Sequence, residues 1–255
     1  KEIGFSIKQT KDIIQLQKPK IKKTKNALYV TLSNLLCVKD IRDITVIELC
    51  KEAGINKSTF YLHYKYIYES INNQIEDTYK YYNFLIENIN NEVYMSPSSY
   101  LIARNITIIY NALRYSKDSI ESWYHLIENN RRVRVVTTHN NLKLEHYLKY
   151  EKPYLISWDR ASIDMPIFDL VSLYKNHYLD FEFSDLLKIY LSKYPLSEEE
   201  LLLFLTIISI PDKIEYNEST YQTVLKIRRV IDYIYISMAV LLMWVLSVRL
   251  LKYRY

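Results

Sequence analysis

Glycine is nearly absent from this 255-residue chain, which contains only Gly4 and Gly54. Loops that cradle phosphate on backbone N–H groups need several glycines within a few residues, and these two stand far apart. The sequence therefore excludes a P-loop, a dinucleotide-binding fingerprint and the Gly-rich loop of protein kinases. It also excludes folds built from many β-hairpins, because their tight turns require residues with positive φ.

Cysteine is scarce as well, and charge of one sign does not dominate. Cys37 and Cys50 fit neither the spacing of a zinc site nor a disulfide framework. Residues 1–17 are amphipathic and charged, without the apolar centre of a signal peptide, so we expect a reducing, cytoplasmic compartment. The net charge of +5 is mild and does not by itself identify a nucleic-acid partner.

Apolar residues make up 49% of the chain, which is enough for a buried core. Few helix breakers and many Leu, Ile, Lys and Glu predict a mainly α fold. We expect an N-terminal three-helix helix-turn-helix domain followed by a larger helical region with at most a small β-hairpin. The predicted divisions are an arm at residues 1–19, a helix-turn-helix domain at 20–94, a second helical domain at 95–232, and an apolar C-terminal helix at 233–255. The boundary near residue 95 is drawn at Met95-Ser-Pro-Ser-Ser99, a cluster of turn residues.

A pattern typical of a helix-turn-helix lies near the N-terminus. Apolar residues recur at helical spacing over residues 21–36, and the capping box Thr45-Val-Ile-Glu48 then starts a short second helix. That helix ends at Gly54, where the backbone is free to turn, and Asn56 can cap a third helix over residues 57–64. A short helix, a glycine turn and a capped helix together predict this DNA-binding motif.

The stretch ITVIELCKEAGINKSTFYLHYKYIY, residues 44–68, resembles the TetR family of bacterial repressors, and the resemblance covers about residues 20–82. It implies that the third helix enters the major groove of double-stranded DNA. Positions that would approach base edges are Lys57, Ser58 and Thr59; positions that would hold phosphates are Thr45, Tyr61, His63 and Lys65. The phosphate positions carry hydrogen-bond donors, as such contacts require. The alternative is that Tyr61 and His63 only cover an amphipathic helix.

Two segments of the second region, VVTTHNNLKLEHYL at residues 135–148 and YLISWDRASIDMPIFDL at 154–170, resemble the lower lobe of aminoglycoside-phosphotransferase and spore-coat-type kinases. The resemblance covers about residues 100–232. It implies a catalytic loop that reads His-x-Asp, with an Asn five residues later, and a metal-binding Asp at the end of a short strand. The corresponding residues here are His139, Asn141, His146 and Ser157. A later Asp-x-Pro-x-x-Asp-Leu pattern, largely structural in those families, is present at residues 164–170.

The substitutions at these positions decide the predicted chemistry. Phosphoryl transfer needs one carboxylate to orient the attacking hydroxyl and another to hold Mg²⁺, whereas Asn141 is neutral and Ser157 is a poor Mg²⁺ ligand. Asp159 is an alternative ligand two residues further on, but Asn141 would remain neutral. We therefore predict no enzymatic activity, no catalytic residue, no metal and no cofactor. We expect His139, Asp159 and Asp169 to make hydrogen bonds within a helical core.

Two features near the C-terminus predict helices. Ser197, followed by three Glu residues, predicts an N-cap and a helix start. Residues 233–248 carry no charge and are mostly apolar, but a membrane-spanning helix needs about twenty such residues. A buried core or a subunit interface is therefore favoured over a membrane anchor.

The sequence as a whole predicts a TetR-type DNA-binding transcription regulator that acts as a homodimer on a palindromic operator. Its second region would form the dimer and has room for a small-molecule effector. Two alternatives stay open: a catalytically inactive kinase-like interaction protein, and a regulator tethered to a membrane by its C-terminal helix.

Overall fold

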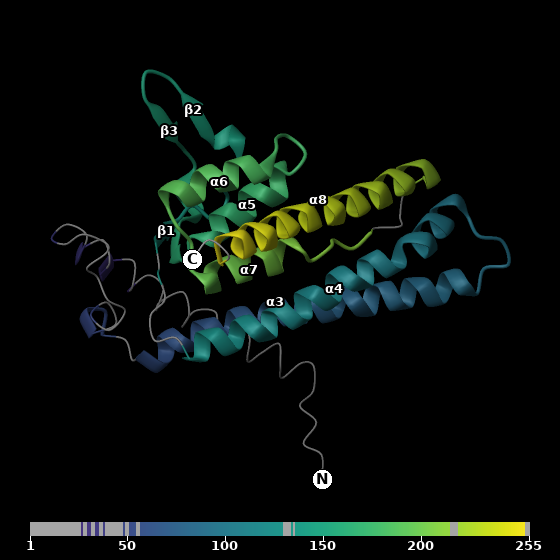
Figure 1. The fold of residues 1–255 in the computed structure, drawn as a ribbon, viewed down its shortest axis with the longest axis horizontal. Coiled ribbons are helices and arrows are strands. Elements are labelled where there is room, and N and C mark those ends of the chain that lie inside the picture. Colours follow the sequence, from purple (N-terminus) through teal and green to yellow (C-terminus); the bar gives the residue numbers. More distant parts are fainter. Residues whose placement is uncertain are drawn as a thin grey trace, which may run out of the picture.

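The computed structural model describes residues 51–54, 57–129, 136–214 and 219–252, with single positions at 27, 30, 31, 34, 35, 38, 48 and 134. Side chains are described in these ranges except at residues 57–63, 129, 163 and 245–252. The predicted arm at residues 1–19 lies outside the described residues. Within the described part the fold is mainly α, as predicted. Two long helices lie along one side, and a group of shorter helices with the C-terminal helix packs on them (Figure 1).

The two long helices, α3 (Lys57–Asn90) and α4 (Pro97–Asn129), run antiparallel and pack along each other (Figure 1). Each carries a buried stripe in which residues recur mainly at intervals of three, four or seven, so that one face of each helix is apolar. The stripe comprises Tyr64, Ile67, Ile71, Ile75, Tyr82, Leu85 and Ile89 on α3, and Ile102, Ile109, Leu113, Ile120, Trp123 and Ile127 on α4. Burial of these two facing stripes holds the pair together.

Helix α3 is longer than the sequence pattern indicated. The third helix of the predicted motif was expected to end at Tyr64, whereas α3 continues without interruption to Asn90. No Gly or Pro follows until Pro97, and apolar residues keep their helical spacing beyond Tyr64, so nothing stops the helix earlier. The domain boundary predicted at residue 95 falls next to the turn between two packed helices.

The cluster of turn residues around Pro97 starts a helix rather than forming a long linker, because α4 begins at Pro97. Proline suits the first helical position, where an N–H group would have no acceptor within the helix. Ser96 Oγ accepts the N–H of Ser99 at 3.1 Å and caps the helix. Ser99 Oγ in turn donates to Glu92 Oε1 at 2.9 Å, which ties the turn to the end of α3.

Four short strands follow α4. β1 (Val136–Thr138) pairs antiparallel with β4 (Ser162–Asp164), and β2 (Tyr147–Lys149) pairs antiparallel with β3 (Pro153–Leu155). The sequence led us to expect at most one small hairpin, whereas the described residues form two separate strand pairs. Strands of three residues are too short to show a period of two, and the partners of β1–β4 are distant in the chain.

The remaining helices are α5 (Ile167–His177), α6 (Phe183–Lys193), α7 (Glu198–Ile208) and α8 (Thr220–Lys252). α7 is almost entirely buried and packs against α4 and α5. Aromatic rings fill the space between these helices, and the ring centroid of Tyr174 lies 4.8 Å from that of Phe183 in an edge-to-face arrangement. The body of the protein is therefore one continuous core shared by α3, α4 and the helices above them.

The start of α7 confirms the predicted N-cap at Ser197. Ser197 Oγ accepts the N–H of Glu200 at 3.3 Å, and Glu200 Oε2 accepts the N–H of Ser197 at 2.8 Å, which together form a capping box. The Glu200 carboxylate is buried, and it also accepts a hydrogen bond from Arg134 Nε at 2.9 Å. Arg134 thereby connects the segment before β1 to the start of α7.

The apolar C-terminal run belongs to α8, which begins at Thr220 rather than near Tyr233. Tyr233, Ile234 and Val240 are buried, whereas Leu242 is 56% exposed. The helix thus buries one face against the body, mainly along α4, and leaves the other at the surface. Within the described residues, no helix has both the length and the apolar character needed to cross a bilayer.

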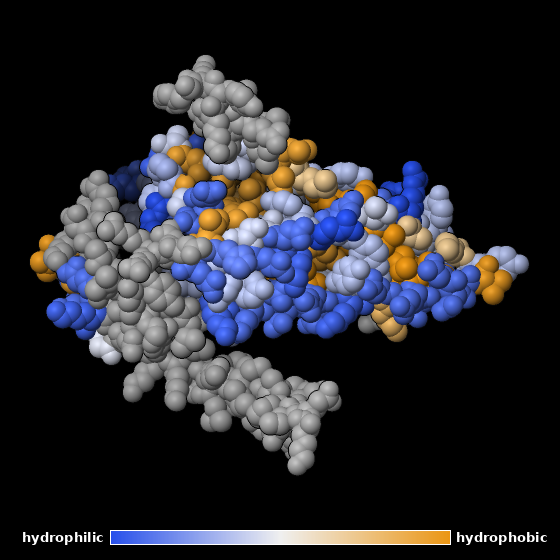
Figure 2. Space-filling model, turned by 60° about the horizontal axis from the view of Figure 1, so that its bottom comes forward, coloured by the Kyte–Doolittle hydropathy of each residue, from blue (hydrophilic) through white to orange (hydrophobic). Residues whose placement is uncertain are grey.

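The surface of the long helices is mostly hydrophilic, as Figure 2 shows. Hydrophobic side chains appear at the tip where α3 meets α4 (Figure 2); in this turn Val93 is 89% exposed and Met95 is 47% exposed. The apolar residues of the turn are therefore not part of the core.

Candidate functional site

A network of hydrogen bonds surrounds the loop that follows β1. The Asp169 carboxylate, in the first turn of α5, accepts the backbone N–H of His139 and that of Asn140, each at 2.8 Å. Asn140 has a φ of 58°, in the left-handed region that residues other than glycine seldom adopt. Its side-chain amide donates to Ser162 Oγ on β4 at 2.6 Å. Asn is among the residues that adopt this region most readily, and Asp169 and Ser162 fix the loop in this conformation.

The His139 ring is completely buried and joins this loop to the segment after β3. Its Nε2 lies 2.8 Å from the carbonyl oxygen of Ile156, and because a carbonyl only accepts, Nε2 carries the proton. Nδ1 is then an acceptor, and the backbone N–H of Asn141 donates to it at 3.3 Å. Both ring nitrogens are thus occupied by backbone groups, so the ring is unavailable as a base or a metal ligand.

The other positions of the kinase-like pattern gather around this ring. His146, the last residue of η2 (Leu144–His146), donates from Nδ1 to the carbonyl oxygen of Asn141 at 2.8 Å. The ring centroids of His146 and Trp158 lie 5.3 Å and 5.0 Å from that of His139. Ser157 lies just before Trp158 and, like Asn140, has a positive φ, of 66°. Residues distant in sequence thus meet in one loop cluster.

The side chains of this cluster limit its chemistry. Asn141 supplies an amide and the exposed Ser157 a hydroxyl, so neither supplies a carboxylate. His139 and Asp169 make hydrogen bonds as predicted, but they do so in the loop cluster after β1 rather than within a helical core. The prediction for Asp159 is wrong, because the turn η3 (Trp158–Arg160) carries Asp159 at the exposed surface rather than in the core. Within the described part of the chain, no three His, Cys, Asp or Glu side chains are placed to hold a metal ion.

One residue of the loop cluster was missed by the sequence analysis. His177, at the end of α5, is buried, and its Nε2 accepts the backbone N–H of Leu144 at 3.1 Å. Its Nδ1 therefore carries the proton and donates to Asp180 Oδ2 at 2.6 Å. This histidine anchors the second half of the loop to α5. The short His177–Asp180 spacing is visible in the sequence, but nothing there indicates the contact with Leu144.

Most of the predicted DNA-binding residues lie at the start of α3. Five of them lie in the first two turns of α3, with side chains outside the described set: Lys57, Ser58, Thr59, Tyr61 and His63. Thr45 lies outside the described residues altogether. Lys65 is the member of the set whose side chain is described; it is exposed, and its Nζ lies 3.8 Å from Glu69 Oε1.

The turn before α3 has the geometry that the sequence predicts. Gly54 has a φ of 64°, and its N–H donates to the carbonyl oxygen of Lys51 at 3.2 Å. An added Cβ would meet no atom within 4 Å, so glycine is needed here for its backbone conformation and not for space. Tyr64 is 1% exposed, and Ala53 packs against the same core.

The chain matches no protein-family model, no curated protein and no solved structure. Its function is therefore inferred from the residues and contacts described above.

Proposed function

We propose that the protein is a non-enzymatic DNA-binding transcription regulator of TetR type that acts as a homodimer on a palindromic operator. One observation carries the proposal: two turns into α3, at Tyr64 and Lys65, the helix has a core-facing side and a solvent-facing side. Tyr64 is buried, whereas the neighbouring Lys65 projects a positive charge into solvent. A helix that is anchored on one face and carries an exposed lysine on the other suits insertion into the major groove.

The proposed roles of the residues follow from their chemistry. Ammonium, hydroxyl and imidazole groups donate to phosphate oxygens, which positions the helix without reading sequence. Short polar side chains at the start of the helix can reach base edges and supply specificity. The phosphate-contacting set is Thr45, Tyr61, His63 and Lys65, and the base-contacting set is Lys57, Ser58 and Thr59.

The salt dependence of DNA binding tests the proposal. The operator would first be selected from a random duplex library, and affinities measured by fluorescence anisotropy at several salt concentrations. Lys65→Ala should weaken binding to all sequences alike and lower the salt slope by about one unit, because one fewer counterion is released. Lys80→Ala is the matched control, since it removes the same charge from an exposed position further along α3. Equal slopes for wild type and Lys65→Ala would contradict the assignment.

Thr59→Ala tests base reading separately from phosphate contact. It should relax the preference at one base position, at a cost of about 1–3 kcal/mol against the best site, without changing the salt slope.

Sedimentation of the protein with operator DNA should show two chains bound per palindrome, with half-sites about one helical turn or a multiple apart. One chain per duplex, or affinity unchanged by Lys65→Ala and Thr59→Ala, would rule out the proposed reading mode.

A second candidate is favoured by the hydrogen-bond network at Asp169. A carboxylate that accepts two consecutive backbone N–H groups fixes a loop which, in this chain, lacks both carboxylates needed for phosphoryl transfer. This arrangement supports a catalytically inactive kinase-like interaction protein whose rigid loop is a binding surface. The second candidate predicts no selected operator and no effect of Lys65→Ala on any DNA affinity.

A further inference from the structure

A cavity of about 310 Å³ lies between α5, α8 and the connecting segment 211–214, and its lining shares no residue with the loop cluster or with the start of α3. It is at the lower end of the size range of small-molecule sites, about 300–1,000 Å³. The lining residues are Lys175, Tyr178, Asp212, Lys213, Ile214, Lys226, Arg229, Val230 and Tyr233. Four of them are cationic and one is anionic, so the walls carry a positive formal charge.

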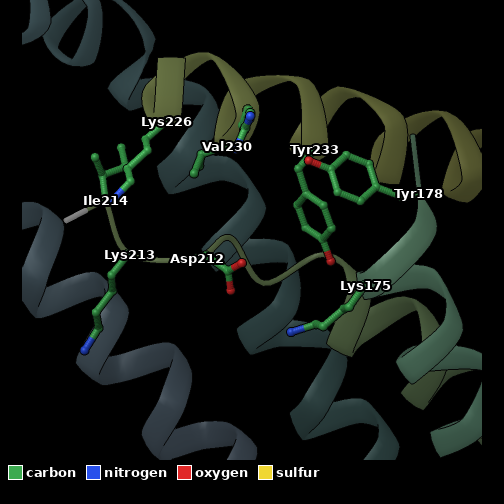
Figure 3. Close-up of a pocket in the computed structure, with 9 residues that line it drawn as sticks. Lys175, Tyr178, Asp212, Lys213, Ile214, Lys226, Val230 and Tyr233 are labelled. Carbon is green, nitrogen blue, oxygen red and sulfur yellow. The ribbon is translucent and has the colours of Figure 1, made fainter. Parts of the chain in front are cut away.

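One wall of this cavity is held in place by α3. Tyr82 donates its hydroxyl proton to the carbonyl oxygen of Asp212 at 2.6 Å, and Tyr81 donates to that of Ile214. Lys213 turns away from the cavity, with its Nζ 5.9 Å from the centroid of the Tyr81 ring (Figure 3). The segment that carries Asp212 is therefore fixed by contacts with α3.

One hydroxyl group that faces the cavity has no hydrogen-bond partner among the described residues. The Tyr233 side chain is 7% exposed, and its hydroxyl has no partner among the described residues. The Ser237 hydroxyl, one turn further along α8, is hydrogen bonded with Tyr174 at 2.9 Å. Figure 3 shows the Tyr233 hydroxyl, the Lys175 ammonium and the Asp212 carboxylate pointing toward the same space. A buried hydroxyl without a partner costs about 1–3 kcal/mol, so its retention calls for an explanation.

Lys175 adds a donor of the same kind. No hydrogen bond or ion pair involves its ammonium among the described residues. Burial lowers the pKa of this ammonium, an effect that the nearby Asp212 carboxylate opposes. A hydroxyl and an ammonium that both lack an acceptor would be satisfied together by one group with two or more negatively charged oxygens.

We propose that this cavity is a binding site for a small organic oxyanion, a carboxylate or a phosphate monoester with an apolar body. Tyr233 and Lys175 donate to the oxyanion, and Val230 and Tyr178 contact the apolar part. Asp212 limits affinity for anions through its own negative charge. The proposal rests on the lining of this cavity and does not depend on the proposal that α3 binds DNA.

Isothermal titration calorimetry on the full chain at pH 7 and low salt tests the proposal with benzoate, phenyl phosphate and benzamide. Benzamide has the shape of benzoate without the charge. We expect at least one of the two anions to bind at least tenfold more tightly than benzamide, and the preferred anion distinguishes carboxylate from phosphate. If neither anion binds more tightly than benzamide, the proposal is wrong.

Three substitutions move the affinity in different directions. Tyr233→Phe should weaken binding of the preferred anion about tenfold while leaving the melting temperature unchanged or raised, because the removed hydroxyl has no partner. Lys175→Met should also weaken binding, and Asp212→Asn should strengthen it several-fold by removing a repelling charge. Lys188→Met, at an exposed position of α6, is the control and should have no effect.

If Lys175→Met fails to fold, Tyr233→Phe still tests oxyanion binding, because this substitution preserves the ring and its packing. Anion affinity unchanged in Tyr233→Phe, or lowered by Asp212→Asn, would overturn the assignment of the oxyanion to this cavity.

Discussion

The Asp169 carboxylate accepts two consecutive backbone N–H groups, and the left-handed Asn140 is one of the two donors. We expect Asp169→Asn to lower the free energy of unfolding by about 2–3 kcal/mol, because hydrogen bonds to a charged acceptor are lost and one N–H faces an amide NH₂ group. Urea denaturation measures the change. Asp159→Asn is the control: this carboxylate is exposed on η3, and its loss should change stability by less than about 0.5 kcal/mol.

Asn141 leads to a prediction about chemistry. Because neither Asn141 nor Ser157 provides a carboxylate, we expect no Mg²⁺-dependent consumption of ATP with aminoglycosides or small alcohols as acceptors. A coupled assay for ADP release measures this, with Asn141→Ala as the control for contaminating kinases. Turnover that Asn141→Ala abolishes would contradict the prediction; turnover that persists in the variant comes from another protein.

For single residues, the sequence predicted which side chains make hydrogen bonds better than it predicted backbone conformation. The hydrogen-bonding roles of His139 and Asp169 were expected from the kinase-like resemblance and from the carboxylates that it lacks here. The positive φ of Asn140 and Ser157 was not expected, because Asp169 and the strands on either side impose it. Asp159 was misplaced because a single turn of 3₁₀ helix changes which side chains face solvent, and no periodic pattern marks so short an element.

Helix α7 starts with a capping box. The Ser197 hydroxyl and the Glu200 carboxylate satisfy each other's backbone N–H groups. We expect Ser197→Ala to destabilise the protein by about 1 kcal/mol, measured by thermal or urea unfolding, because the N–H of Glu200 loses its acceptor. Ser197→Asp keeps an acceptor at the same position and should retain most of the stability. Equal losses for Ala and Asp would show that the hydroxyl has a role other than capping.

Some helices and strands are encoded by side chains close together in the sequence, and others depend on contacts between distant segments. The cap of α7 and the helical character of α3 and α4 follow from side chains a few residues apart, so the sequence predicted them. The β1–β4 pair and the cluster around His139 depend on contacts between segments about twenty to thirty residues apart, which no local pattern encodes. The helix end predicted at Tyr64 came from the motif rather than from a breaker residue, and α3 continues past it.

The molecule as a whole is rich in tyrosine, with 26 in the chain, and several have a pKa above the ordinary value near 10 because they are buried. Burial raises the pKa of Tyr174 to about 12, and the pKa of Tyr233 is also well above its usual range. In the unfolded chain these phenols lose their protons near pH 10, whereas in the folded protein they keep them. Stability is therefore fully present below pH 10 and falls as the pH rises toward 12.

We expect the free energy of unfolding to fall by about 1.4 kcal/mol per pH unit for Tyr174 alone between these two pKa values, with further losses from the other buried phenols. Guanidinium denaturation at pH 7, 9, 10 and 11, with tyrosinate absorbance followed in parallel, measures this. Tyr174→Phe should flatten the decline, and Tyr150→Phe, at a position 73% exposed, should not. Complete tyrosinate formation in protein that remains folded would contradict the expectation.

The unbroken course of α3 has a mechanical consequence for the proposed regulator. A helix of 34 residues is about 50 Å long and behaves as a single lever arm. A tilt of only about 5° at its Asn90 end displaces the Lys57 end by about 4 Å. That displacement is close to the spacing of successive base pairs, about 3.4 Å along each strand. In the proposed dimer, a small change in the angle between the two α3 helices would therefore change the distance between their N-terminal ends by one base-pair spacing or more.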